Sequence, residues 1–349
     1  MSSPLTTLQK KLLAEKLGGL ILTSYEDVSN PNISYFISQD LYGLVVIPTR
    51  KKPVVFLSSL EEAPKGIRVL RYASRKELAA LLKKELGRKR VGIDTVHCSA
   101  QTYLGLKRLL HKKLSSFSSA CKKLRAVKSS GEIRVMEKAC RISDAILRSC
   151  IASFSSFKTE KEVEQFLIAE TKKRGCALSF PPIVASGKNA ACPHYHAKTA
   201  KLQKGFCVLD FGVKYKGYCT DTTRTIFVGT PTEHERDVYD RLRVAQELLI
   251  AKSRPGISCA SLHRAAEKLL GPDAKYFIHS LGHGVGLEIH ESPAISSSSK
   301  ETLTKNMVIT IEPGIYVPND FGIRIEDTLV VDSEPYLLTK VSKELICID

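Results

Sequence analysis

Two acidic residues interrupt a pair of apolar segments that are otherwise typical of the two strands of a β-hairpin. Residues 206–213 carry Asp210 and residues 217–224 carry Asp221, with a turn expected at 215–216 between them. In that hairpin the two aspartates lie directly opposite each other, with β-carbons about 5 Å apart on one sheet face. Like charges placed in this way destabilise a sheet. The pattern therefore predicts a bound cation or a shared proton between the two carboxylates.

The same arrangement recurs further along the chain. Residues 307–316 carry Glu312 and residues 322–327 carry Glu326, on either side of a turn expected around Asn319. The pairing register places these two glutamates across from each other as well. Each one interrupts an apolar run, where an unpaired carboxylate is costly to bury. Two such acidic pairs in one domain indicate a dinuclear metal site.

Histidines and glycines are concentrated between the two predicted hairpins. Residues 277–293 contain three glycines and three histidines, namely His279, His283 and His290. The glycines let the backbone approach a bound group closely and exclude a plain helix. A second loop, residues 189–196, contains His194 directly after a proline, and catalytic groups often lie on such loops. We expect the three-histidine segment to belong to the metal site.

The first part of the chain has a pattern of alternating short strands and helices. A helix is predicted to begin at Ser74, with Glu77 completing a capping box. Short β-rich runs separated by Pro and Gly occur before it, at residues 19–22, 44–47 and 54–57. This pattern predicts an α/β unit.

A serine- and lysine-rich stretch at residues 112–131 separates this unit from the rest of the chain. Longer helical periodicities and the β-rich hairpins follow it, and together they predict an α+β domain with antiparallel strands. The helices are expected at 133–150, from Thr159, from Thr232 and at 258–270. We place the two domains at residues 1–123 and 124–349.

The net charge of +17 is concentrated in the first domain. Residues 1–125 carry 23 basic and 9 acidic side chains, a balance of +14, while the remainder carries 30 basic and 27 acidic ones, a balance of +3. Such an excess of basic side chains is typical of proteins that bind nucleic acid. The basic residues fall in doublets such as Lys83-Lys84, without interleaved aromatic residues, which is typical of a solvated surface. The sequence therefore argues against nucleic acid as the main partner.

The ten cysteines are scattered singly, without a C-x-x-C pair. This spacing argues against a disulfide framework or a zinc–thiolate site and fits a reducing compartment. The first residues lack the pattern of a signal peptide, and no run approaches the ~18 apolar residues that a membrane span needs. We expect a cytoplasmic protein with no membrane partner.

Taken together, these motifs resemble those of the pita-bread metallopeptidases, and in particular the proline-specific branch of aminopeptidase P and prolidase. The resemblance covers nearly the whole chain. It is carried by the segments L-D-F-G, D-T-T-R-T, G-H-G-V-G, I-E-P-G and R-I-E-D. It implies a pita-bread catalytic domain, with an antiparallel sheet flanked by helices, preceded by a smaller creatinase-like α/β domain. It also implies a homodimer.

The resemblance further implies roles for individual residues. The implied metal ligands are Asp210 on one ion, Asp221 and Glu326 bridging both ions, and His283 and Glu312 on the second ion. The implied substrate-facing or proton-handling residues are His194, His279 and His290, with Arg324 supporting the bridging glutamate.

The chemistry of such a site explains its residue types. Two divalent ions about 3.5–4 Å apart lower the pKa of a shared water enough to supply hydroxide near neutral pH. Carboxylate-rich ligation with one imidazole suits manganese, cobalt, iron or zinc, and the carboxylates favour manganese. We expect the metal-bridging hydroxide to attack the peptide bond before a proline at the second position, with Glu312 as general base.

The first expectation for function is an Xaa-Pro aminopeptidase acting on peptides with proline at the second position. The alternative within this class is an Xaa-Pro dipeptidase (prolidase), because the sequence does not show how open the pocket is beyond the proline. A different class is a non-catalytic peptide- or nucleic-acid-binding relative of the fold. Such relatives typically lose metal ligands, whereas all five implied ligand positions are intact in this sequence.

Overall fold

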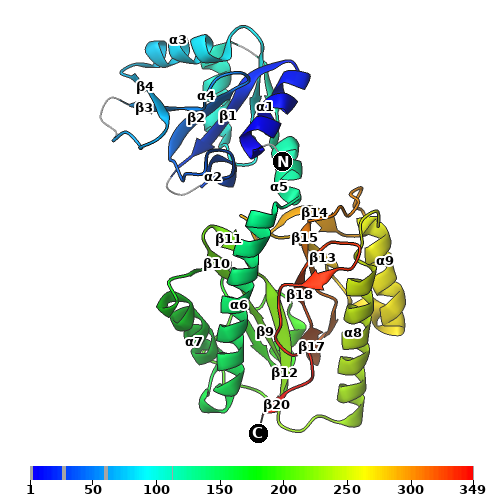
Figure 1. Ribbon diagram of the computed structural model, residues 1–349. Helices are drawn as coiled ribbons and strands as arrows, with labels where there is room; N and C mark the ends of the chain where they lie inside the picture. Colours follow the sequence, from blue (N-terminus) through cyan, green and yellow to red (C-terminus); the bar gives the residue numbers. More distant parts are fainter. Residues whose placement is uncertain (1–2, 26–28, 59–61, 112, 349) are drawn as a thin grey trace. The chain divides into compact units, whose positions relative to one another are not determined.

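The computed structural model divides the chain into two compact units, Met1–Arg125 and Ala126–Asp349, both drawn in Figure 1. Lys112, at the start of the serine- and lysine-rich stretch, lies outside the described residues. The residues that the structure describes are 3–25, 29–58, 62–111 and 113–348. Over these ranges, no helix has both the length and the apolar character needed to cross a membrane.

The first unit is built on a mixed sheet with the strand order β4-β3-β2-β1-β5-β6. Its strands are β1 (Leu17–Ser24), β2 (Gly43–Pro48), β3 (Val54–Ser58), β4 (Arg68–Tyr72), β5 (Arg90–Ile93) and β6 (Leu114–Ser116). β5 lies parallel to both β1 and β6, whereas β2 is antiparallel to both β1 and β3. The three predicted β-rich runs lie inside β1, β2 and β3, which confirms the prediction of an α/β unit.

Helices cover both faces of this sheet. On one face, α3 (Arg75–Leu86) and α4 (Ala100–Leu110) bury leucines against the strands. On the other face lie α1 (Pro4–Ala14), α2 (Pro31–Ile37) and α5 (Ser118–Ala126). Helix α3 begins as predicted, because the Ser74 side chain accepts a hydrogen bond from the Glu77 backbone N–H at 3.2 Å. The Glu77 carboxylate, however, accepts from the backbone N–H of Ala73 and not from that of Ser74.

The second unit places strands between two pairs of helices (Figure 1). The helices are α6 (Ser130–Ala152), α7 (Glu160–Lys173), α8 (Glu233–Lys252) and α9 (Cys259–Leu270), with short 3-10 turns η1 (Phe154–Ser156), η2 (Gly187–Ala191) and η3 (Gly271–Tyr276). Each of the four α-helices begins at a Ser or Thr whose side chain caps it, namely Ser129, Thr159, Thr232 and Ser258. These starts agree with the helices expected from the sequence.

The strands of this unit form several small sheets. The larger ones have the orders β20-β12-β9-β8 and β14-β13-β15-β18-β19, and the smaller ones β11-β10-β7 and β16-β17. Their bounds are β7 (Ala177–Leu178), β8 (Ile183–Ser186), β9 (Gly205–Phe211), β10 (Val213–Tyr215), β11 (Tyr218–Cys219), β12 (Thr222–Val228), β13 (Gly282–Gly284), β14 (Glu291–Ile295), β15 (Val308–Ile311), β16 (Gly314–Val317), β17 (Phe321–Arg324), β18 (Asp327–Val330), β19 (Tyr336–Leu337) and β20 (Cys347–Ile348). The pairs that follow the two predicted hairpins are antiparallel, so the α+β prediction is confirmed.

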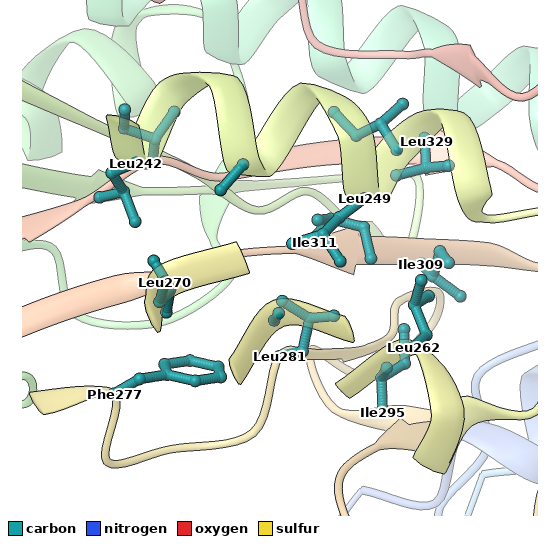
Figure 2. Packing of buried hydrophobic residues seen from close by; sticks show 14 of the residues in the cluster. Leu242, Leu249, Leu262, Leu270, Phe277, Leu281, Ile295, Ile309, Ile311 and Leu329 are labelled. Atoms are coloured by element: carbon teal, nitrogen blue, oxygen red, sulfur yellow. The ribbon is translucent and has the colours of Figure 1, made fainter. Parts of the chain in front are cut away.

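Two hydrophobic cores hold the helices on these strands. One core joins α6 and α7 to β8, β9 and β12. The other joins α8 and α9 to β15 and β18, and Figure 2 shows Leu249 of α8 beside Ile311 of β15, with Leu242 and Ile309 in the same cluster. Each fully buried leucine or isoleucine contributes about 1.5–3 kcal/mol. The strands therefore form a well-packed base for whatever side chains lie at their ends.

Each strand predicted for the two hairpins is broken in the structure. The stretch 206–213 is divided between β9 and β10, 217–224 between β11 and β12, 307–316 between β15 and β16, and 322–327 between β17 and β18. Three of the four candidate acids, Asp221, Glu312 and Glu326, lie in these breaks, and Asp210 lies in β9 two residues before the break at Gly212. At a break the side chains leave the regular alternation of a strand, so residues from different strands can turn towards one point.

Candidate metal centre

The first hairpin does not have the predicted register. Asp210 pairs with Thr223, not with Asp221. The turn is formed by Lys216 and Gly217, both with positive φ (48° and 83°), one residue later than expected. A two-residue turn with both φ values positive matches the twist of a hairpin, which explains the shift. Asp221 precedes Thr223 by two residues, so it remains on the same face and lies diagonal to Asp210.

The second hairpin has the predicted register on both sides of its break. Ile311 pairs with Asp327, and Gly314 pairs with Arg324. Glu312 and Glu326 thus occupy equivalent positions between the two ladders. The turn residue Asn319 has a φ of 62°, as expected for a tight turn.

Backbone hydrogen bonds from the breaks join three separate segments at one place. The N–H of Glu326 donates to the carbonyl of Thr223 at 3.1 Å, which ties the second hairpin to the first. The N–H of Glu312 donates to the carbonyl of Leu281 at 2.9 Å, which ties it to the three-histidine segment. These bonds satisfy backbone groups that the broken ladders leave over. They also bring the acids of both hairpins close to His283.

The His283 ring faces these carboxylates. Its Nε2 lies 3.5 Å from Oδ2 of Asp221 and 3.4 Å from Oε1 of Glu312. Its Nδ1 lies 3.1 Å from the carbonyl oxygen of Gly284, an arrangement that assigns the proton to Nδ1 and leaves Nε2 as a ligand atom. One ligand atom from each of Asp221, His283 and Glu326 can be chosen so that all lie within 4.8 Å of one another.

Two oxygens of the cluster have no hydrogen-bond partner although they are buried. They are Oδ1 of Asp210 and Oε1 of Glu326. A buried acceptor without a partner is costly, and a cation is the partner that would satisfy both. Oxygen and imidazole donors around one point form a donor set that divalent metals bind. The residues therefore fit a metal centre.

The pKa values of the acids also indicate that the cluster lacks a positive charge. Burial raises the pKa of Asp221 and of Glu326 well above the ordinary carboxyl range, and the neighbouring carboxylates raise both further. Burial also raises the pKa of Glu312, although the nearby His283 and Arg324 oppose this rise. Without a cation, carboxylates this close cannot all ionise near neutral pH.

Arg324 is a buried cation beside this cluster. Its Nη2 donates to Oδ2 of Asp210 at 2.6 Å, and its Nε donates to the Thr223 hydroxyl at 3.1 Å. That hydroxyl donates in turn to Oε2 of Glu326 at 2.7 Å. Arg324 therefore fixes one oxygen of Asp210 directly and one oxygen of Glu326 through Thr223. The oxygens left over are the unpartnered ones described above.

The other predicted histidines surround the cluster. The His290 ring lies 4.4 Å from the His283 ring, between centroids. Nε2 of His279 lies 3.0 Å from the Tyr316 hydroxyl, and its Nδ1 lies 2.7 Å from the Ser280 carbonyl. Burial lowers the pKa of His279 to about 4, with the charge of Arg324 adding to the effect. Burial is the main cause of the lowered pKa of both His279 and His290, and the exposed His194 contributes to both, so it lies near them.

Sequence reasoning missed the hydroxyl groups that orient these side chains. Thr223 faces Asp210 in the true register and would have been found with the correct turn. The Thr310 hydroxyl accepts the N–H of His283 and donates to Oε1 of Glu312 at 3.3 Å. The Tyr316 hydroxyl accepts from Arg324 at 2.6 Å. Thr310 and Tyr316 lie two and four residues from Glu312, so strand spacing could have indicated Thr310.

The fold and the site define a two-domain protein with a buried, carboxylate-rich candidate metal centre in its second domain. Residues 134–333 match the model of metallopeptidase family M24, and residues 4–127 match that of the creatinase/prolidase N-terminal domain. The chain belongs to metallopeptidase family M24, and its second domain has the pita-bread fold. As a member of this family it is a metal-dependent peptidase that uses divalent ions.

Relatives and solved structures resemble the chain along its whole length. An Xaa-Pro dipeptidase from Pyrococcus horikoshii is 34% identical over 329 residues, which cover 91% of this chain and 92% of the relative. The crystal structure of the prolidase from P. horikoshii superposes with a TM-score of 0.89 at 31% identity, covering 98% of this chain and 99% of that one. An X-Pro aminopeptidase structure from Thermotoga maritima has a TM-score of 0.87 at 26% identity, with 97% and 99% coverage.

Proposed function

We propose that this protein is an Xaa-Pro dipeptidase, which hydrolyses the bond between the first residue and a proline in a dipeptide. The observation that carries the proposal is the Xaa-Pro dipeptidase from P. horikoshii, which is similar over nine-tenths of both chains. The aminopeptidase expected first has support from a structure at lower identity, 26%. The relatives therefore favour the alternative that the sequence left open, and the dipeptidase replaces the aminopeptidase as the leading function.

The proposed metal ligands are the carboxylates of both hairpins together with His283. Asp210 would serve one ion, Asp221 and Glu326 would bridge two, and His283 and Glu312 would serve the second. The unpartnered oxygens of Asp210 and Glu326 support this assignment, as does the orientation of Nε2 of His283 towards Asp221 and Glu312. Four carboxylates with one imidazole favour manganese, with cobalt, zinc or iron as alternatives.

When bound, divalent ions in such a site supply Lewis acidity and lower the pKa of a water molecule. Glu312 is the proposed general base. It would take a proton from the attacking water and deliver it to the proline nitrogen as the C–N bond breaks.

The histidines have different proposed roles. With its proton on Nδ1, His279 donates a hydrogen bond to the Ser280 carbonyl and accepts one from the Tyr316 hydroxyl. Both ring nitrogens therefore have a partner. We assign it to positioning Tyr316 and, through it, Arg324. His290 and the exposed His194 are the proposed substrate-facing residues. Partial desolvation lowers the pKa of His290, which is exposed like His194, so at neutral pH it would contact the substrate as a neutral hydrogen-bonding group.

The test compares Ala-Pro, Ala-Pro-Ala and Ala-Ala as substrates of the manganese-loaded protein, with released alanine measured in each case. A dipeptidase cleaves Ala-Pro and leaves Ala-Pro-Ala intact, and the proline requirement predicts slow cleavage of Ala-Ala. Release of alanine from Ala-Pro-Ala would restore the aminopeptidase. Failure to bind metal and to cleave any of the three would favour the non-catalytic binding relative instead.

We also propose a homodimer located in the cytoplasm. The resemblance to pita-bread peptidases supports the dimer, and light scattering of the purified protein tests it. All ten cysteines are free, and seven of them are buried, which supports a reducing compartment. Localisation of the tagged protein by cell fractionation tests the second proposal.

A further inference from the structure

We propose that Glu160, which lies outside the candidate metal centre, is a positioning residue for His194. Glu160 is the first residue of α7 and is completely buried. Its Oε1 accepts hydrogen bonds from the backbone N–H of Ser186 at 2.8 Å, the Ser186 hydroxyl at 2.9 Å and the side-chain amide of Asn189 at 3.0 Å. One carboxylate oxygen thus fixes both ends of a short turn.

The burial of Glu160 is costly and is not offset by a cation. Among the described residues, no Lys, Arg or His forms an ion pair with it. A buried carboxylate without a counter-ion is rare, because burial penalises the charge and hydrogen bonds recover only part of that penalty. A neutral side chain could fill the same space at lower cost. The acid is therefore better explained by what its oxygen holds in place than by stability.

What it holds is the segment that leads to His194. Ser186 ends β8, Asn189 lies in η2, and His194 follows three residues after η2. Between them Gly187 has a φ of 56°, and a β-carbon there would lie 2.7 Å from the side chain of Gln203. The chain therefore turns sharply where Glu160 binds it. Because a three-residue step separates η2 from His194, a displacement of η2 is passed on to that histidine.

The opposite side of the same segment rests on the strand that carries Arg324. A β-carbon on Gly322 would lie 1.8 Å from the carbonyl oxygen of Ala190, so the two backbones are in direct contact. Nη1 of Arg324 also donates to the carbonyl of Pro193 at 3.4 Å. The segment is thus held between Glu160 and β17. Loss of the Glu160 contacts would free one side and leave His194 without a fixed position near His290.

This inference deepens the proposed function and rests on it for the contact between His194 and a dipeptide. Glu160 would act through the segment and not on the substrate. We therefore expect Glu160→Ala to raise KM for Ala-Pro about 10-fold or more, with a smaller change in kcat, because misplaced binding groups cost this much or more. Metal content should stay at the wild-type value.

A double-mutant cycle with His194→Ala tests the route of action. If Glu160 acts through His194, Glu160→Ala adds nothing to KM once His194 is alanine. If the two effects multiply, or if Glu160→Ala leaves KM unchanged, the inference is wrong. Glu160→Gln keeps an acceptor oxygen and the side-chain volume, so it should recover most of the affinity. Glu162→Gln, an exposed residue of the same helix turn, is the matched control and should have wild-type KM.

Hydrogen exchange of the purified chain supplies a readout that does not depend on activity. Glu160→Ala should speed exchange of the Ser186 amide and of residues 189–196, whereas Glu162→Gln should leave it unchanged. A wild-type protein that cleaves no Xaa-Pro dipeptide would refute the proposed function alone, and the exchange data would still decide whether Glu160 holds the segment. Unchanged exchange in Glu160→Ala would overturn the inference. Should that variant not fold, Asn189→Ala, which removes the side-chain donor that links η2 to Glu160, provides the same comparison.

Discussion

Each of the two units buries carboxylates at strand ends, but the two sets of carboxylates have opposite surroundings. In the first unit Asp94 directly follows β5 and is 1% exposed. Its oxygens lie 2.7–3.1 Å from four side chains, namely Asn30, Asn32, His97 and Ser118. In the second unit Asp210 and Glu326 each keep a buried oxygen without a partner. In the first unit both oxygens of the buried acid have hydrogen-bond partners. In the second unit two of the buried acids each keep one oxygen without a partner.

The pKa values have opposite directions for the same reason. Although burial opposes it, hydrogen bonds from His97 and Ser118 lower the pKa of Asp94 well below its usual range. Burial and the neighbouring carboxylates raise the pKa of Asp221 and Glu326. A buried acid whose oxygens all accept hydrogen bonds stabilises the fold. A cluster of buried acids with unpartnered oxygens is instead suited to bind a cation. Burial alone therefore does not distinguish a structural acid from a ligand.

The largest expected effect is the loss of hydrolysis in Asp221→Asn. Removing one ligand charge from the metal centre should lower kcat/KM for Ala-Pro by about 10³-fold or more, equivalent to about 4 kcal/mol. Steady-state kinetics at saturating manganese measures it. Asp94→Asn is the matched change in the other unit and should keep the activity of the folded protein within a few-fold. An equal loss of kcat/KM in both variants would contradict the proposed difference between the two buried acids.

The next prediction concerns the free energy of unfolding. Here a change at Asp94 is expected to be the damaging one, and a change at Asp221 is not. Asp94→Ala should lower the free energy of unfolding by about 3–5 kcal/mol, because it leaves the polar side chains around it without their shared acceptor. Asp221→Asn should instead stabilise the metal-free protein, because it removes repulsion between carboxylates. Urea unfolding of metal-free samples measures both. A destabilised Asp221→Asn would show that the acid cluster is structural.

A smaller effect is expected from Thr223→Val. The threonine hydroxyl donates to Glu326 and accepts from Arg324, and loss of such a supporting group weakens metal affinity by about 10–100-fold. Calorimetric titration with manganese measures the change. Thr223→Ser keeps the hydroxyl and should bind manganese like the wild type. Normal affinity in Thr223→Val would mean that this network does not orient the ligands.

The pH dependence of stability should also differ between metal-free and manganese-loaded protein. Because the folded-state pKa of Asp221 and Glu326 is raised, their contribution is fully present below the ordinary carboxyl pKa of about 4 and is lost as pH rises through the folded values. The Tm of metal-free protein should therefore fall as pH rises above the ordinary carboxyl range, by about 2–4 °C for each kcal/mol lost. Manganese should remove this decline, and a decline that persists with the metal would contradict the assignment.

The smallest effect is expected from the basic surface of the first unit. Lys83 and Lys84 are exposed on α3. Replacing both with alanine should change the free energy of unfolding by no more than about 0.5 kcal/mol. Hydrolysis of Ala-Pro should remain at the wild-type rate. A loss of activity in this variant would give the +14 charge of residues 1–125 a role in substrate or partner binding.

The sequence predicted the metal-binding chemistry better than the detailed geometry. Asn319 tolerates positive φ and set the second hairpin correctly, so Glu312 and Glu326 have the predicted register. The first hairpin was wrong because Lys216, a non-glycine residue, takes the positive φ that a turn at 216–217 needs. The acids still share a face, because the shift moves the partner residue by two positions.

Other features could not be predicted because they depend on distant residues. Nothing near Asp94 in the sequence shows that Asn30, Asn32 and Ser118 converge on it from other elements. Glu160 looked like an ordinary first-turn residue of a capped helix, yet it is buried against β8 and η2. Tertiary packing determines the surroundings of both Asp94 and Glu160, and the local sequence pattern does not indicate them.

The metal stoichiometry of the purified chain shows whether the carboxylates of both hairpins and His283 hold two ions. Equilibrium dialysis against manganese, followed by elemental analysis, should give two ions per wild-type chain. Glu326→Gln removes a proposed bridging ligand and should bind fewer than two ions under the same conditions. The claim is contradicted if the wild type binds no divalent ion, or if Glu326→Gln retains two with unchanged affinity.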